Sequence, residues 1–125
     1  MMRTPLKTVR RLGSAKEGSD HFWRQRLTAV ANLILIPLLL LLIVGMSSAD
    51  YSEVRRSLAH PVVAVVLVLT LLASLTHMRL GMQTIIEDYV HRDRHKVPLL
   101  MLNTFFAVFI GAICIWAVLK LSFGA

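Results

Sequence analysis

Three long stretches of apolar residues alternate with short polar segments along the chain. They cover about residues 27–46, 61–86 and 99–121 and together use nearly the whole sequence. A helix of roughly 20 mostly apolar residues crosses a hydrocarbon core about 30 Å thick. The pattern therefore predicts an all-α integral membrane protein with three transmembrane helices, in which a polar segment (1–25) precedes the membrane domain (26–122).

The composition also indicates a membrane protein, and it excludes two kinds of covalent cross-link. Of the 125 residues, 56% are hydrophobic, which is far from the balance of a soluble domain. The polar segment ahead of the first span lacks a small-residue cleavage site, so we expect a retained helix rather than a removable signal. The single cysteine, Cys114, excludes an internal disulfide, and without a Cys-x-x-Cys-His motif a covalent c-type haem is also excluded.

The net charge of +7 does not indicate nucleic-acid binding, because the Lys and Arg residues flank the spans instead of gathering on one soluble face. Most precede the first span or lie in the second loop, whereas the first loop has only Arg55 and Arg56. The positive-inside rule then predicts a cytoplasmic N-terminus and second loop and a periplasmic C-terminus. We expect a multi-pass protein of the bacterial inner membrane, in contact with lipid.

The two loops carry simple local signals. The first loop is short and has room for one amphipathic turn, after which Pro61 suits a first helical position. Pro98 similarly predicts the start of the third helix. Phe22 and Trp23 stand where aromatic side chains anchor to lipid headgroups.

One face of the second span carries small or polar residues at helical spacing around His77. The other members of this stripe are Thr70, Ala73, Ser74, Gly81, Thr84 and Asp88. Small residues in a membrane helix allow another helix or a flat ligand to approach closely. Gly81 removes a side chain one turn from the histidine and leaves room beside the imidazole.

His77 is well inside the predicted membrane. It precedes Asp88 by 11 residues, which places it roughly 16 Å deeper at 1.5 Å per residue. An ionisable group there suggests a function. A neutral imidazole can ligate haem iron, with a second ligand from another subunit because the other histidines lie at span ends or in loops: His21, His60, His91 and His95. Spacing alone equally allows a histidine bonded to a neighbouring helix or lining a proton path.

Asp88 and Tyr89 end the same helix at its predicted cytoplasmic side. A tyrosine hydroxyl can donate to a quinone carbonyl, and an adjacent carboxylate can relay protons. The simpler alternative is an interfacial tyrosine beside an ordinary helix-end charge. Arg79 lies on nearly the opposite face from His77, where it would extend to the surface or pair with a phospholipid or a haem propionate.

The combination of His77, Gly81, Gln83 and "DYV" (88–90), in the second of three spans, resembles the small hydrophobic membrane-anchor subunits of succinate dehydrogenase, respiratory complex II. The N-terminal "GSAKEGSDHFWRQRLTAVAN" is similar to the entry segment of the alphaproteobacterial type. The resemblance covers about residues 11–120.

This resemblance implies a non-catalytic subunit that, with a sister cytochrome b anchor subunit, holds the flavoprotein and iron–sulfur subunits at the cytoplasmic face. It implies that His77 is an axial ligand of the iron of haem b, with the other ligand on the sister subunit. Tyr89 would hydrogen-bond ubiquinone, and Asp88 would line the same region. Arg26, or alternatively Arg24, would contribute to the surroundings of the haem propionates or quinone.

Other functions fit parts of the pattern. A fumarate reductase anchor would differ little in this subunit, and a purely structural anchor would leave the haem site empty. A small proton- or solute-conducting subunit without haem would use His77, Arg79 and Asp88 as a polar path, but these groups belong to one helix and the first two point apart. The chain has no dinucleotide fingerprint and no cysteine cluster, so succinate oxidation would occur on another polypeptide.

Overall fold

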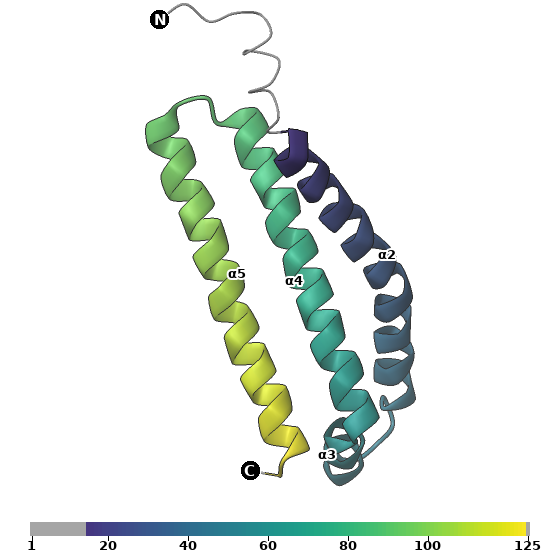
Figure 1. Cartoon of the computed structure of the whole chain (residues 1–125). Coiled ribbons are helices and arrows are strands. Elements are labelled where there is room, and N and C mark those ends of the chain that lie inside the picture. The colour runs from purple at the N-terminus through teal and green to yellow at the C-terminus, as the bar shows by residue number, and fades with distance from the viewer. Residues whose placement is uncertain (1–14, 125) are drawn as a thin grey trace, which may run out of the picture.

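The structure, a computed structural model, describes residues 15–124 and their side chains from Gly18 onward. Residues 1–14 of the predicted polar segment lie outside the described residues. The described part forms four helices and no strand: α2 (Ala15–Gly45), α3 (Tyr51–Ala59), α4 (Pro61–Tyr89) and α5 (Asp93–Ser122) (Figure 1). Three of them, α2, α4 and α5, are long and apolar enough to cross a membrane. The predicted all-α fold with three spans is confirmed, and the predicted orientation stays a prediction.

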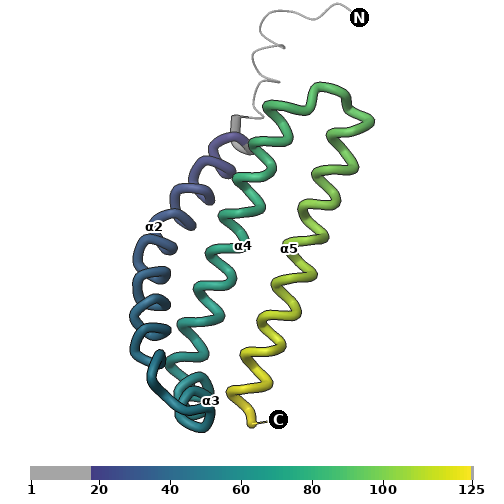
Figure 2. Tube along the Cα trace, turned by 180° about the vertical axis from the view of Figure 1, so that it is seen from behind, coloured from purple at the N-terminus to yellow at the C-terminus, as the bar shows by residue number. Residues whose placement is uncertain are grey.

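The three long helices form a single layer with α4 in its middle. Helix α4 packs against α2 on one side and α5 on the other, and within residues 15–124 no Cα atom of α2 lies within 8 Å of one of α5. Figures 1 and 2 show this order from two sides, with α3 across the end where the C-terminus lies. Both faces of α4 are therefore open over part of their length.

Helix boundaries differ from the expected spans at two places. Helix α2 begins at Ala15, so the polar residues ahead of position 27 continue the same helix. Pro61 is the first residue of α4, as predicted, but the prediction that Pro98 starts the third helix is wrong, because α5 begins at Asp93. A proline at its sixth position removes only the hydrogen bond to the Arg94 carbonyl, and this carbonyl belongs to an exposed turn where water can replace the donor.

The amphipathic turn expected in the first loop is the nine-residue helix α3. Its N-terminus carries a capping box: Asp50 accepts a hydrogen bond from the Glu53 N–H at 2.9 Å, and the Glu53 carboxylate accepts from the Asp50 N–H at 3.3 Å. The Ser52 hydroxyl also donates to Asp50 at 2.8 Å. The Glu53 N–H, followed by the Ser52 hydroxyl, lowers the pKa of the Asp50 carboxyl below its usual 3.8.

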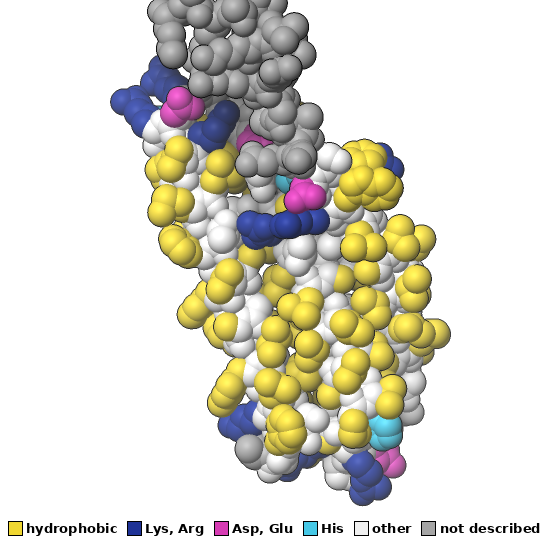
Figure 3. All heavy atoms as spheres, in the orientation of Figure 1, with side chains coloured by type: hydrophobic (Ala, Val, Ile, Leu, Met, Phe, Trp, Pro, Cys, Tyr) yellow, Lys and Arg dark blue, Asp and Glu magenta, His cyan; other side chains and the backbone are white. Residues whose placement is uncertain are grey.

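Apolar side chains dominate the outside of the layer. Figure 3 shows hydrophobic atoms over the middle of the molecule and Lys and Arg side chains gathered toward its two ends. Among the described residues, no large side chain is less than 2% exposed. The chain is thus a multi-pass membrane protein whose apolar surface is available to lipid or to other membrane subunits.

Candidate functional site

A seam of polar and small side chains lies between α2 and α4 in the part of the bundle that holds His77. We call it the polar seam, and its members are His21, Gln25, Thr28 and Asn32 of α2 with Ser74, His77 and Gly81 of α4. Two hydrogen bonds cross it: the Thr28 hydroxyl lies 3.1 Å from His77 Nδ1, and the Ser74 hydroxyl donates to Asn32 Oδ1 at 3.1 Å. The stripe predicted on the second span therefore faces α2.

The Thr28 hydroxyl is the hydrogen-bond partner of His77 Nδ1 and also lies close to two backbone carbonyls of α2. Its oxygen lies 2.8 Å from the Arg24 carbonyl and 3.1 Å from the Gln25 carbonyl, so its single hydrogen is shared between these acceptors. With its hydrogen on one of these carbonyls, the same oxygen accepts from His77, which then donates through an Nδ1–H. The neutral imidazole consequently keeps its lone pair on Nε2.

The other ring nitrogen of His77 has no hydrogen-bond partner among residues 18–124. A neutral imidazole that donates through one nitrogen and presents the lone pair of the other is the form in which histidine binds a metal. No group of three His, Cys, Asp or Glu side chains gathers as a metal site within the described residues. An iron bound to His77 would thus take its remaining ligands from a porphyrin and another chain.

Gly81 lies one turn along α4 from His77, opposite Gln25. A Cβ built at Gly81 would lie 3.7 Å from Gln25 Nε2, which is an ordinary contact. Two polar atoms at this end of the seam, Gln25 Oε1 and His21 Nε2, are buried without a hydrogen-bond partner in the described structure. Buried polar atoms normally find a partner, so this end of the seam has capacity for a further hydrogen-bonding group.

Asp88 and Tyr89 lie at the end of α4, away from His77. Both are exposed, and Tyr89 keeps 79% of its surface accessible. The 12 positions from His77 to Tyr89 correspond to roughly 18 Å along a helix. The structure therefore separates the histidine from the Asp88–Tyr89 pair and leaves the tyrosine hydroxyl on an open surface.

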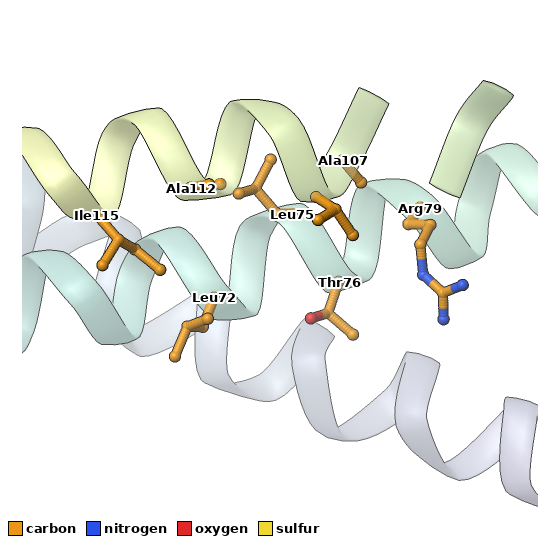
Figure 4. A pocket seen from close by; sticks show the side chains of 9 residues that line it. Leu72, Leu75, Thr76, Arg79, Ala107, Ala112 and Ile115 are labelled. Carbon is orange, nitrogen blue, oxygen red and sulfur yellow. The ribbon is translucent and has the colours of Figure 1, made fainter. Parts of the chain in front are cut away.

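Arg79 is half-buried between the three helices rather than fully extended into the surroundings. Its carbonyl accepts a hydrogen bond from the Asn103 side chain of α5 at 2.9 Å. The residue borders an apolar cavity of about 240 Å³ between α4 and α5, and Figure 4 shows its guanidinium on the α2 side of α4 (Figure 4). It also lines a polar cavity of about 210 Å³ with Asp20, His21, Arg24, Leu80 and Gln83.

The two arginines expected near the start of the first span have different environments. Arg26 is exposed, and its guanidinium carbon lies 4.7 Å from the centre of the Phe22 ring. Arg24 lines the polar cavity beside Arg79 and lies 3.7 Å from the Asp20 carboxylate. An anionic group in this cavity would therefore meet Arg24 before Arg26.

Comparison with known proteins identifies the family of this chain. The family described as succinate dehydrogenase/fumarate reductase transmembrane subunit matches residues 1–119. The chain belongs to this family. The resemblance seen in the second span is confirmed.

Several relatives bear the name succinate dehydrogenase hydrophobic membrane anchor subunit. The Paracoccus denitrificans protein is 25% identical over 122 residues, which are 98% of this chain and 94% of the relative. The Rickettsia bellii protein is 29% identical over 106 residues, 85% of each chain. A succinate dehydrogenase membrane anchor subunit of Reclinomonas americana is 30% identical over 101 residues, covering 74% of this chain and 80% of its own length.

No solved structure gave a significant match. The relatives nevertheless support a non-catalytic succinate dehydrogenase membrane anchor subunit, and this role implies association with the other subunits of that enzyme.

Three residues of this anchor subunit escaped sequence analysis, namely Gln25, Thr28 and Asn32 of the polar seam. They recur at intervals of three and four residues in the first span, which places them on one face of a helix. That periodicity was visible in the sequence. The sequence does not show that this face of α2 packs against the face of α4 that carries His77.

Proposed function

We propose that in the assembled succinate dehydrogenase His77 of this subunit is an axial ligand of haem b. The hydrogen bond between Thr28 and His77 supports this assignment, because it directs the proton to Nδ1 and leaves the Nε2 lone pair available. A second group that orients a ligating histidine is the usual arrangement in metal sites. When bound, haem b supplies a one-electron acceptor inside the membrane part of the complex.

The sister subunit and this chain both contribute the other groups around the haem. The second axial ligand belongs to the sister cytochrome b anchor subunit, which packs on the open apolar surface described above. Gly81 keeps the turn beside His77 free of a side chain. Arg24 or Arg26 neutralises the propionates, and the position of Arg24 beside Arg79 in a polar cavity favours Arg24.

We propose further that Tyr89 and Asp88 contribute to the site where ubiquinone is reduced. The Tyr89 hydroxyl donates a hydrogen bond to a quinone carbonyl oxygen, and the neighbouring Asp88 carboxylate holds or transfers a proton at that oxygen. Because Tyr89 is exposed in the single chain, the other walls of this site belong to partner subunits. The flavoprotein subunit oxidises succinate, and the iron–sulfur subunit delivers the electrons.

Fumarate reduction would use the same anchor residues, so the family description leaves the physiological direction to experiment. A conducting subunit without haem has less support. His77 lies in the polar seam against α2, whereas Arg79 borders the cavities beside α5 and Arg24. Neither cavity that Arg79 borders is lined by His77, although the polar cavity shares His21 with the polar seam.

The deciding experiment is a reduced-minus-oxidised optical spectrum of the complex purified through a tag on this chain. His77→Ala should abolish or strongly reduce the b-type haem signal, whereas His95→Ala, which changes an exposed histidine near the start of α5, should retain it. Pull-down of the flavoprotein and iron–sulfur subunits reports assembly separately. Full haem content in an assembled His77→Ala complex would refute the ligand assignment.

A further inference from the structure

Two adjoining hollows lie at the end of the bundle that carries α3 and the C-terminus. The first has a volume of about 320 Å³ and a mostly apolar wall, lined by Tyr51, Ser52, Arg55, Arg56 and Ala59 of α3 and by Leu121, Ser122 and Gly124. Two exposed arginines and two hydroxyl-bearing serines thus border it. Such a set of donors suits the phosphate of an anionic group.

The second hollow is an apolar groove of about 440 Å³ between the start of α4 and the end of α5. Its walls include Val65, Leu69, Leu119 and Phe123, and it shares Ser122 with the first hollow. The shared residue makes the cationic hollow and the apolar groove neighbours. The groove runs along residues of two membrane-spanning helices, so it faces the hydrocarbon region.

We propose that the two hollows together bind one anionic phospholipid. Its phosphate lies at Arg55 and Arg56, its glycerol at Ser122, and one acyl chain in the α4–α5 groove. Helix α3 lies across the ends of the spans (Figure 1), and the ends of membrane-spanning helices are where lipid headgroups are expected. Charge complementarity supports an anionic headgroup, since among the described residues the only ion pair joins Arg24 to Asp20 at the other end of α2.

The occupant must satisfy both hollows at once. A soluble anion would use the arginines and leave the apolar groove to be filled separately. A helix of another subunit would fill the groove but would not require two adjacent cations. A phospholipid explains the arginines of the first loop, which the haem and quinone sites do not use, together with the open groove beside them.

The test uses the intact complex in phosphatidylcholine vesicles that contain a small fraction of phosphatidylglycerol with a diazirine on one acyl chain. After illumination, peptide mass spectrometry measures labelling of residues 61–69 and 119–123. We expect labelling in the wild type and a roughly tenfold loss in Arg55→Gln/Arg56→Gln, from removal of two headgroup contacts. Arg92→Gln/Arg94→Gln loses the same charge at the other end of the bundle and should leave labelling unchanged.

A second pair of variants tests the groove. Val65 lines it and is 58% exposed, so Val65→Phe fills it without disturbing a packed core. Val62 is 64% exposed on the same helix but does not line the groove, and Val62→Phe serves as the control. Labelling should fall in the first variant only.

Five outcomes would overturn the proposal. Equal labelling by a diazirine phosphatidylcholine would mean nonselective lipid contact. Displacement of the probe by soluble glycerol 3-phosphate would indicate a simple anion site, and labelling indifferent to Val65→Phe would place the acyl chain outside the groove. Labelling unchanged by the arginine substitutions would remove the headgroup assignment. Absence of labelling in the intact wild-type complex would show that the groove is covered by a partner subunit.

Discussion

The Thr28 hydroxyl oxygen and His77 Nδ1 lie 3.1 Å apart in a hydrogen bond that links α2 to the histidine of α4. Its loss in Thr28→Val should leave the imidazole free to change tautomer and orientation. Loss of a residue that orients a metal ligand typically lowers metal affinity by about 10–100-fold. We expect reduced haem retention in Thr28→Val and a shifted haem midpoint potential in the complexes that keep it, measured by optical redox titration.

Thr28→Ser retains the hydroxyl and provides the matched control. It should restore both the haem content and the potential of the wild type. An unaltered potential in Thr28→Val would mean that the hydrogen bond does not act on the iron through His77.

Tyr89→Phe removes the hydroxyl that we place at the quinone. Ubiquinone reduction should fall by roughly tenfold or more, consistent with loss of a positioned proton donor, while succinate oxidation with a soluble dye should be unchanged. Tyr51→Phe is the natural control, because Tyr51 is equally exposed at 79% but lies at the opposite end of the bundle. Equal quinone kinetics in the two variants would exclude a role for the Tyr89 hydroxyl.

Gly111 permits the close packing of α5 on α4. A Cβ at this position would lie 3.0 Å from Leu75 Cδ1, so Gly111→Ala requires a small shift of a flexible side chain. Gly111→Val should be worse, with about 1–3 kcal/mol of destabilisation from overpacking. A lower thermal stability of the solubilised complex would report this, and Gly45→Ala, where nothing lies within 4 Å, should have no packing effect.

The Asp50 cap makes helix α3 sensitive to acid. Its pKa is lowered below 3.8 by the Glu53 N–H and the Ser52 hydroxyl, so its stabilising contribution is complete above that value and is lost as the pH falls through the lowered pKa. Amide protection of residues 51–59, corrected for intrinsic exchange, should therefore decrease at acidic pH. Asp50→Asn cannot titrate and should remove this step; an identical acid response would contradict the cap as its source.

The pattern of apolar residues was enough to predict the three helices that span the membrane. The three apolar stretches and the helix-starting role of Pro61 follow from local chemistry, and the stripe around His77 follows from a single helical projection. Helix boundaries were less predictable. Asp93 to Val97 continue α5 ahead of Pro98, because a proline near a helix start removes a bond that water can replace.

The sequence allowed prediction of the candidate residues on each helix, but not of the contacts between helices. His77 is recognisable because an ionisable group is unusual deep in a membrane span, whereas Asp88 and Tyr89 gain a role only through the family resemblance. The hydrogen-bond partner of His77 is not recognisable, since Thr28 lies more than 40 positions away in sequence, as does Asn32 from its partner Ser74. Only the packing of α2 on α4 brings the Thr28 hydroxyl to His77 Nδ1.

The central place of α4 has a consequence for how the subunit is made. Within residues 15–124 no Cα atom of α2 lies within 8 Å of one of α5, so the close helix contacts of α2 are with α4, whereas α5 packs on α4 and on α3. A newly inserted copy that has not met its neighbours would present an incompletely paired His21–Gln25 region and a wide apolar surface to membrane proteases. We therefore expect surplus copies to be short-lived, so that the cellular amount of this chain follows the supply of its partners.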